Sequence, residues 1–366
     1  MDLLGDGSNP FVLRQRRLRD LLLDRGIPVL LVTNPFNICY LTGFRGSAGI
    51  AAFDAEESRL WVDPRYTLQA REQARGVKVI EEKKRLSEAA AFWLRKKTRR
   101  VGYEDSHLTC AVLSQFKRAA DGKLRFKPAG GIVEELRSVK DSGEIDAIRQ
   151  AGHLTAQVLR DVLQELRPGV RECDLAAEIE YRMRRAGAEG AAFETIVASG
   201  SRAALPHARA STKAVTAGEL VIFDLGAILG GYASDMTRTV FIGKPSRRAR
   251  GLYQAVLESQ QHAIESVREG IACGDVDAAA RGSLKRGGLG QYFTHSTGHG
   301  VGLEIHEKPR IGRGEKAVLQ TGNIVTVEPG IYIEGYGGVR IEDSVLVHSE
   351  GPEILTPLAK DEWLID

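Results

Sequence analysis

The segment from Leu220 to Gly243, LVIFDLGAILGGYASDMTRTVFIG, constrains the fold of this chain more than any other, because it has the pattern of a β-hairpin with an acid on each strand. An apolar run ends at Asp224, and a second run, Met236–Ile242, follows Asp235. Between them, Gly230-Gly231 supplies the positive-φ residues that a tight reversal needs. Folding about that turn places the two aspartates roughly opposite each other. Such a pair repels and is costly to bury unless a cation lies between the carboxylates.

The same pattern occurs a second time near the C-terminus. The segments Ile324–Ile333 and Gly338–Val347 flank a turn at Glu334–Gly337, and Glu328 and Glu342 fall at nearly equal distances on either side of it. The stretch between the two hairpins, THSTGHGVGLEIHE, contains His295, His299 and His306. Four carboxylates and an imidazole are enough to hold two divalent ions. The spacing therefore predicts a two-metal site.

Length and composition indicate a globular protein of two domains. A chain of 366 residues exceeds what one hydrophobic core usually supports. Its 43% hydrophobic and 27% charged residues are typical of globular proteins. A net charge of +3 is too small to indicate nucleic acid as a partner. No apolar run approaches the roughly 20 residues of a membrane span, so we expect no membrane partner either.

The cysteines and the N-terminus favour a cytoplasmic location. The four cysteines are scattered and form no CxxC pair, which is typical of reduced structural thiols. The stretch Met1–Asp6 lacks a charged region followed by an apolar one, so we expect no secretory signal.

The first third of the chain alternates helix and strand patterns, which predicts an α/β domain without a cluster of metal-ligating residues. The expected helices are Phe11–Arg25, a helix opened by Pro64 and ending near Ala74, and Leu86–Thr98. The expected strands are Pro28–Thr33, Gly49–Phe53, Ser58–Val62 and Val77–Glu81. These elements follow from hydrophobic periodicity and from the Gly and Pro residues that punctuate it.

The domain boundary is expected near Arg137–Asp141, which divides the chain into residues 1–138 and 139–366. Asp141 and Glu144 have the spacing of a capping box at the start of a helix. The expected helices of the second domain are Ser142–Leu166, Glu172–Arg185, Ser246–Glu269 and Asp275–Lys285. Helix pairs that alternate with acid-bearing hairpins suggest two related halves packed face to face.

The ligating residues resemble those of the Xaa-Pro peptidase branch of the metallopeptidase family that shares the pita-bread fold with methionine aminopeptidase and creatinase. The family's metal ligands are two aspartates eleven residues apart, the His of a Gly-His-Gly, the Glu of a Glu-Pro-Gly, and a Glu two residues after an Arg. In this chain they fall, without departure, on Asp224, Asp235, His299, Glu328 and Glu342.

The first third also resembles a known domain. The stretches NPFNICYLTGFRGSAG (Asn34–Gly49) and DPRYTLQA (Asp63–Ala70) are similar to the N-terminal domain of aminopeptidase P, prolidase and creatinase. The resemblance implies an α+β protein, with a pita-bread catalytic domain preceded by a smaller creatinase-type α/β domain. In the family this N-terminal domain, often from the partner subunit of a dimer, walls the proline site. We therefore expect a homodimer.

The resemblance also implies a role for each ligand. Asp235 and Glu342 would bridge two metals, Asp224 would hold one, and His299 with Glu328 would hold the other. A metal-bridging hydroxide would attack the peptide bond, and Glu328 would shuttle the proton to the leaving amine. Oxygen-rich donors with one nitrogen favour Mn²⁺, with Co²⁺ or Zn²⁺ as alternatives.

Four more residues match site positions of the family. His207, in the sequence ALPHA, and His306 match histidines that contact the substrate carbonyl and the tetrahedral intermediate. His295 resembles one further substrate contact, and Arg340 matches an arginine that orients the metal-site carboxylates. Taken alone, each histidine is as readily an exposed or structural residue, so these roles depend on the complete motif.

Three functions are compatible with these motifs. The favoured one is a metal-dependent Xaa-Pro aminopeptidase that hydrolyses the N-terminal Xaa-Pro bond of peptides. The alternative is an Xaa-Pro dipeptidase (prolidase), and a more remote one is a non-catalytic peptide-binding module. The complete ligand set disfavours the binding module and also a creatinase-type hydrolase, since both have lost these ligands. Methionine aminopeptidase is disfavoured because that branch lacks the N-terminal domain.

The choice between aminopeptidase and dipeptidase depends on weaker signals. The segment YLTGFRGSAG is more similar to bacterial aminopeptidase P-like enzymes than to prolidases. A strict dipeptidase needs a cation to hold the C-terminal carboxylate of its substrate. Arg310 and, in the N-terminal domain, Arg45 are candidates for that cation.

Overall fold

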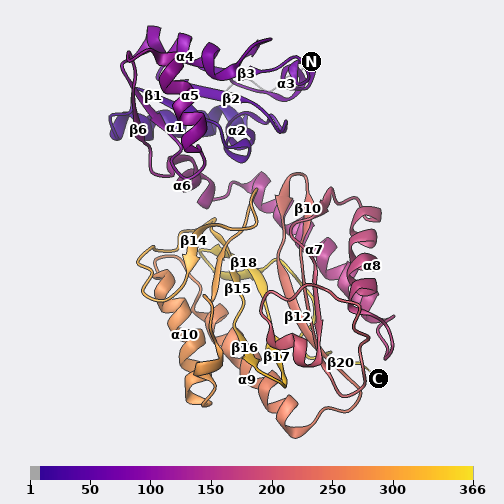
Figure 1. The fold of residues 1–366 in the computed structure, drawn as a ribbon. Coiled ribbons are helices and arrows are strands. Elements are labelled where there is room, and N and C mark those ends of the chain that lie inside the picture. Colours follow the sequence, from indigo (N-terminus) through magenta and orange to yellow (C-terminus); the bar gives the residue numbers. More distant parts are fainter. Residues whose placement is uncertain (1–8, 366) are drawn as a thin grey trace. The chain divides into compact units, whose positions relative to one another are not determined.

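The computed structural model describes residues 9–365, which form two compact units divided between Arg137 and Ser138 (Figure 1). The stretch Met1–Asp6, on which the expectation of no secretory signal was based, lies outside the described residues. Within the described part of the chain, every helix is too short or too polar to cross a membrane.

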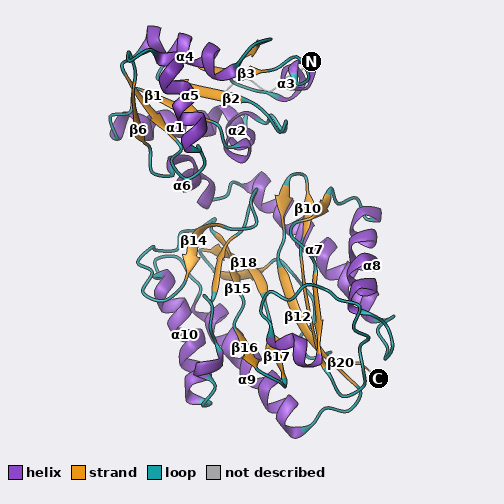
Figure 2. Ribbon diagram, in the orientation of Figure 1, coloured by secondary structure: helices purple, strands orange, loops and turns teal. Residues whose placement is uncertain are grey.

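The N-terminal unit is built on a six-stranded mixed sheet of order β4-β3-β2-β1-β5-β6. Its strands are β1 (Val29–Val32), β2 (Ile50–Asp54), β3 (Ser58–Val62), β4 (Lys78–Glu81), β5 (Arg100–Tyr103) and β6 (Arg125–Pro128). Its helices are α1 (Pro10–Asp24), α2 (Pro35–Thr42), α3 (Thr67–Gln73), α4 (Leu86–Lys97), α5 (Cys110–Ala120) and α6 (Ile132–Ser138), whose last residue belongs to the second unit. Figure 2 shows the helices around this sheet.

Two of these helices begin in the same way. Asn9 and Asn34 each accept the backbone N–H of the residue two positions on, and a proline follows each asparagine at the first helical position. Both features favour helix initiation. The second of these helices, α2, was missing from the sequence prediction. The helix predicted to start at Pro64 starts at Thr67, because the Asp63 carboxylate accepts the N–H of Arg65 and holds a turn there.

The C-terminal unit, which begins at Ser138, contains two main sheets, each paired with two helices. The first sheet has the order β20-β12-β9-β8 and the second β14-β13-β15-β18-β19. Their strands are β8 (Ile196–Ser199), β9 (Leu220–Leu225), β12 (Met236–Ile242), β13 (Gly298–Gly300), β14 (Glu307–Ile311), β15 (Ile324–Val327), β18 (Asp343–His348), β19 (Gly351–Ile354) and β20 (Leu364–Ile365). Shorter elements are β7 (Gly190–Ala191), β10 (Ala227–Leu229), β11 (Tyr232–Ala233), β16 (Gly330–Ile333), β17 (Gly337–Arg340), η1 (Gly200–Ala204) and η2 (Gly290–Tyr292).

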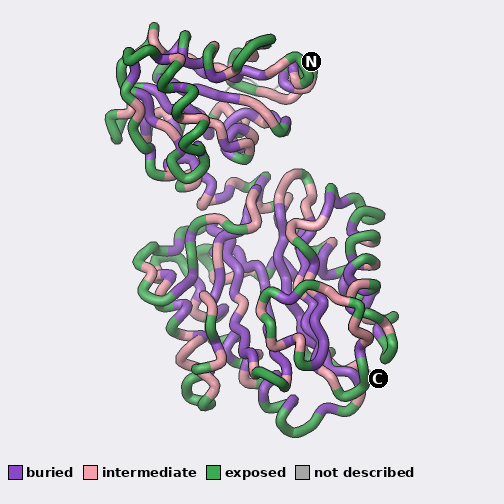
Figure 3. The backbone as a smooth tube through the Cα atoms, in the orientation of Figure 1, coloured by how far each residue is buried: buried purple, intermediate pink, exposed green. Residues whose placement is uncertain are grey.

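The four long helices are α7 (Ser142–Leu163), α8 (Glu172–Arg185), α9 (Arg247–Ser266) and α10 (Cys273–Arg286). The predicted capping box starts α7, where Asp141 and Glu144 bond each other's backbone N–H. One apolar core joins α7 and α8 to β8, β9 and β12, and another joins α9 and α10 to β15 and β18. Figure 3 shows the buried strands between helices whose outer faces are exposed. This arrangement places the two hairpins between the helix pairs.

Candidate active site

The first hairpin places its aspartates as diagonal neighbours. Asp224 pairs with Thr237 across β9 and β12, and Asp235 directly precedes β12. The offset of two residues keeps both side chains on the same face of the sheet. The structure thus refines the expectation that the two aspartates lie opposite each other.

The second hairpin is interrupted at its two glutamates. Val327 pairs with Asp343, and Gly330 pairs with Arg340, so Glu328 and Glu342 lie in the gap between two ladders of the same register. Their backbone N–H groups therefore bond to residues outside this hairpin. Glu328 donates to Thr297 O at 2.8 Å, and Glu342 donates to Thr237 O at 3.1 Å. The second bond joins the two hairpins at the site.

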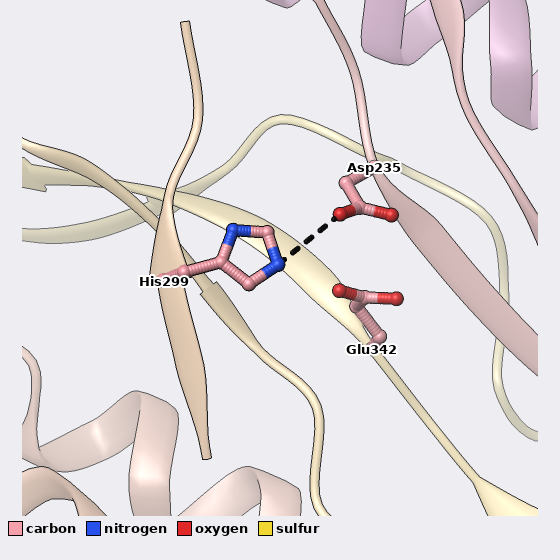
Figure 4. Close-up of side chains that lie close together, drawn as sticks. All are labelled: Asp235, His299 and Glu342. Carbon is pink, nitrogen blue, oxygen red and sulfur yellow. Dashed lines mark ion pairs between the residues drawn. The ribbon is translucent and has the colours of Figure 1, made fainter. Parts of the chain in front are cut away.

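Three of the expected ligands form a tight cluster. One ligand atom from each of Asp235, His299 and Glu342 lies within 4.8 Å of the others, and Figure 4 shows the three side chains converging. His299 Nε2 lies 3.5 Å from Asp235 Oδ2 and 3.7 Å from Glu328 Oε1. Asp224 lines the same cavity. The fold therefore brings residues from both hairpins and from β13 to one point.

The imidazole of His299 is oriented for ligation. Its Nδ1 lies 3.0 Å from Gly300 O and must donate to that carbonyl, which leaves Nε2 facing the carboxylates. Burial, with a smaller contribution from His306, lowers the pKa of His299 to about 4. A neutral ring with an unprotonated Nε2 is the form that binds metals.

The carboxylates of the cluster lie in an environment that disfavours their negatively charged form. Burial, with the nearby Asp224 carboxylate, raises the pKa of Glu342 to about 8. Burial and the Glu342 carboxylate raise the pKa of Asp235 and of Glu328 as well. Clustered buried carboxylates of this kind are stabilised when cations neutralise them. The donor set of four carboxylates and one imidazole therefore fits two divalent ions.

Side chains behind the ligands fix their orientation. The Thr237 hydroxyl donates to Glu342 Oε2 at 2.6 Å and accepts from Arg340 Nε at 3.2 Å. Arg340 also donates from Nη2 to Asp224 Oδ2 at 2.6 Å and from Nη1 to Pro206 O at 3.2 Å. The buried Arg340 is thus in direct contact with the Asp224 carboxylate.

His295 lies in the cavity wall with both ring nitrogens engaged. Its Nδ1 donates to Ser296 O at 2.8 Å, and its Nε2 lies 2.9 Å from the Tyr332 hydroxyl. Burial, with the Arg340 charge, lowers the pKa of His295 to about 4, so the ring is neutral and Nε2 accepts the tyrosine proton. Tyr332 in turn accepts from Arg340 Nη1 at 2.8 Å. In this structure His295 is linked to Arg340 through Tyr332.

A cavity of about 720 Å³ gives access to these groups. The exposed side chains of His207 and His306 line it, and the His306 ring centroid lies 4.3 Å from that of His299. The remaining wall includes Phe193, Glu194, Ile196, Pro206, Arg209, Ile305, Glu307 and Arg310. The cavity wall therefore contains two further arginines, Arg209 and Arg310, besides the expected ligands.

Two residues of the site were missed by the sequence analysis. Thr237 lies two residues after Asp235, and Tyr332 lies four residues after Glu328. Both separations are even, as expected for side chains on one face of extended chain. The even spacing from Asp235 and from Glu328 is the sequence signal that could have identified Thr237 and Tyr332 as site residues.

Comparison with known proteins identifies both parts of the chain. Residues 146–349 match metallopeptidase family M24, and residues 14–139 match the creatinase/prolidase N-terminal domain. An Xaa-Pro dipeptidase of Pyrococcus furiosus is 38% identical over 349 residues, which cover 95% of this chain and 99% of the relative.

Solved structures show the same similarity over both domains. An Xaa-Pro dipeptidase from Bacillus anthracis has a TM-score of 0.94 and 38% identity, covering 97% of this chain and 99% of that one. An X-Pro aminopeptidase from Thermotoga maritima has a TM-score of 0.88 and 36% identity, covering 96% and 100%. The expected architecture, a pita-bread domain after a creatinase-type domain, is confirmed.

Proposed function

The chain belongs to metallopeptidase family M24, in its Xaa-Pro peptidase branch, and on this premise we propose that it is an Xaa-Pro dipeptidase that works with two divalent metal ions. The relatives named Xaa-Pro dipeptidase favour this alternative over the aminopeptidase that the sequence analysis preferred.

The proposed metal ligands are the five side chains at the junction of the hairpins. His299 and Glu328 would hold one ion and Asp224 the other, and Asp235 and Glu342 would contribute to both. The short distances from His299 Nε2 to Asp235 and Glu328 support this division. When bound, two such ions activate a water molecule and polarise the peptide carbonyl. Hard, oxygen-rich coordination favours Mn²⁺.

The remaining groups have roles in orientation and proton transfer. Glu328 is the proposed proton carrier, because it is a buried carboxylate at the cluster whose pKa is raised by burial and by Glu342. His306 and His207 line the cavity beside His299 and are proposed to hydrogen-bond the substrate carbonyl as negative charge develops on its oxygen. His295, through Tyr332, supports Arg340 and thus the Asp224 carboxylate.

The observation that supports a dipeptidase is the position of Arg310. It pairs directly with His299 across β13 and β14, so both side chains leave the sheet on the same face. Its side chain is 68% exposed, lies in the cavity wall, and is 3.9 Å from Glu315. A guanidinium in the wall of the same cavity, on the strand that pairs with His299, is suited to bind the carboxylate of a C-terminal proline. A longer peptide has an amide at that position and gains no such ion pair.

The test compares hydrolysis of Ala-Pro and Ala-Pro-Ala by Mn²⁺-loaded protein. A dipeptidase cleaves Ala-Pro and leaves the tripeptide largely intact. Cleavage of the tripeptide at a comparable or higher rate would instead show an aminopeptidase with an open product side. If neither peptide is cleaved while two metals are bound, the protein is a peptide-binding module.

We also propose that the protein is a homodimer in which the N-terminal domain walls the proline site. The support is the match of residues 14–139 to the creatinase/prolidase N-terminal domain. Sedimentation and assay at one concentration test this assembly. A fully active monomer would rule it out.

A further inference from the structure

The loop that presents His306 is folded around the side chain of the next residue, Glu307. The loop comprises residues 301–306 and joins β13 to β14. Glu307 Oε1 accepts the backbone N–H of Glu304 at 3.0 Å. A Cβ atom at Gly302 would lie 2.5 Å from Glu307 Oε2, so any larger residue there would displace the carboxylate from its place against the loop. The path of the loop therefore depends on the position of this carboxylate.

The charge of that carboxylate is balanced by Lys140. Lys140 Nζ lies 3.1 Å from Glu307 Oε2, and the two side chains are 1% and 5% exposed. Removing one partner of such a buried pair leaves an uncompensated charge in the protein interior. The pair joins the loop to a segment more than 160 positions earlier in the chain, directly after the domain boundary.

The backbone around Lys140 is itself bonded to the segment Gly322-Asn323 of the same unit. Lys140 N–H donates to Gly322 O at 2.9 Å, and Val139 forms a β-bridge with Asn323. The Asn323 amide donates to Ser138 O at 2.8 Å. These bonds hold the backbone at and before Lys140, from which its side chain reaches the Glu307 carboxylate.

The position of the His306 ring follows from these contacts. Glu307 pairs with Gly300 at the start of β14, one residue after His306, and the ladder has a bulge between His299 and Gly300. The His306 ring is exposed and packs edge-on against His299. Because the residue is exposed and its ring contact is with His299, the loop backbone is the main determinant of where the ring lies.

We propose that Lys140 and Glu307 are positioning residues for the reaction, whose buried ion pair holds the 301–306 loop and thereby places His306 over the substrate carbonyl. The inference rests on the proposed function, because it assigns His306 to the substrate. It adds a catalytic dependence on a lysine in the segment that follows the domain boundary.

The first test replaces Lys140 with methionine, which keeps the length of the side chain and removes its charge. We expect Lys140→Met to retain two Mn²⁺ per chain and a KM for Ala-Pro within a few-fold of the original, with kcat lowered roughly 10- to 100-fold by the misplaced ring. Lys97→Met is the matched control, because Lys97 forms ion pairs with Asp54 and Glu57 in the N-terminal unit. An unchanged kcat in Lys140→Met would overturn the proposal.

A double-mutant cycle separates positioning from a general structural effect. If Lys140 acts through His306, then adding Lys140→Met to His306→Ala lowers kcat no further. If the two changes multiply, Lys140 does not act through His306 and the proposal fails.

The third test guards against simple destabilisation. Lys140→Met/Glu307→Gln buries no unpaired charge, so its melting temperature is expected to recover while kcat stays low. Recovery of both would mean that the pair contributes only to stability. Hydrogen exchange of residues 301–306 needs no substrate, and faster exchange in Lys140→Met supports the proposal even if the protein proves not to hydrolyse Ala-Pro. Unchanged exchange in this loop would overturn it.

Discussion

Glu328 and Glu342 occupy the gap in one hairpin ladder; the backbone N–H of Glu342 bonds Thr237 of β12, and that of Glu328 bonds Thr297, just before β13. Because the ladder is interrupted there, the backbone N–H of Glu342 bonds Thr237 of the first sheet, and this bond links the two sheets. The junction also concentrates buried carboxylates, since Asp235 and Asp224 arrive at the same place from the other hairpin. Burying these carboxylates together destabilises the metal-free fold, and bound cations would offset this electrostatic cost.

The first prediction follows from that cost. Glu342→Gln keeps an acceptor for the Thr237 hydroxyl but removes one negative charge from the cluster. We expect the variant to lose turnover by more than the roughly 10- to 100-fold typical of changes outside the ligand set. In EDTA at pH 8 and above, where the parent's Glu342 carboxylate is ionised, we expect it to melt at a higher temperature than the metal-free parent. Scanning fluorimetry and metal analysis check both effects.

The control for this prediction is Glu350→Gln, because Glu350 is exposed in a turn away from the cluster. It should leave the metal content, the rate and the melting temperature as they are. A Glu342→Gln variant that binds two metals and keeps its activity would show that the ligand assignment is wrong.

The acids at this junction were predictable because turn signals and strand alternation fix hairpin register. The Gly230-Gly231 and Glu334–Gly337 turns set which residues face one another. The ladder interruption was not predictable, since it arises from the hydrogen bonds of Glu328 and Glu342 to strands elsewhere in the chain.

Contacts between distant residues account for what the sequence analysis missed. The Lys140–Glu307 pair needs the path of the whole chain between them, and spacing alone did not reveal that Tyr332 lies at His295 Nε2. The helix α2 had a local signal in Asn34-Pro35, which repeats Asn9-Pro10 of α1. This helix, α2, lies within Asn34–Gly49, and the sequence analysis interpreted that stretch only through its similarity to a family motif.

The second prediction concerns pH and metal removal. The pKa of Glu342 in the metal-free fold is about 8, against 4.5 as its ordinary value. The folded protein therefore binds more protons than the unfolded chain between these values. The stability that Glu342 contributes is fully present below about pH 4.5 and is lost as the pH rises through about 8.

The direction of this pH dependence predicts a measurable difference between the metal-loaded and the metal-free protein. Bound metal replaces the protons, so the gap in melting temperature between metal-loaded and EDTA-treated protein should widen from pH 5 to pH 8. Melting curves at several pH values in constant ionic strength check it. A gap that narrows over this range would contradict the prediction.

The third prediction concerns Thr237, whose hydroxyl bonds both Glu342 and Arg340. Thr237→Val keeps the shape and removes both bonds, so we expect the apparent Mn²⁺ affinity to fall by roughly 10- to 100-fold. Thr237→Ser retains the hydroxyl and should retain most of the affinity. Activity titrated with Mn²⁺ measures the difference, and equal behaviour of the two variants would rule out a role for the hydroxyl.

The fourth prediction concerns Tyr332, which joins His295 to Arg340. Tyr332→Phe leaves two buried polar groups without this partner, at a cost of about 1–3 kcal/mol in stability for each unsatisfied group. We expect Arg340 to hold Asp224 less firmly, which lowers kcat while two metals remain bound. Chemical denaturation, metal analysis and steady-state kinetics test the three parts. Full activity together with lowered stability would make Tyr332 purely structural.

The last prediction separates the two peptidase activities at Arg310. This residue shares a sheet face with His299, whereas Arg209, which also lines the cavity, forms an ion pair with Glu194 at 3.1 Å. If Arg310 binds the proline carboxylate, Arg310→Gln loses a charge-assisted bidentate interaction in the bound state. The KM for Ala-Pro should then rise by 10-fold or more, given about 1.5–3 kcal/mol for hydrogen bonds to a charged group.

Two comparisons make the result specific. Ala-Pro amide has no C-terminal charge, so Arg310→Gln should hydrolyse it no worse than the parent does, and the preference for the free acid should disappear. Arg209→Gln should preserve that preference, because the carboxylate partner of Arg209 is nearer (3.1 Å) than that of Arg310 (3.9 Å). If Arg209→Gln abolishes the preference and Arg310→Gln does not, the carboxylate binds at Arg209. If both variants keep it, neither arginine binds the proline carboxylate.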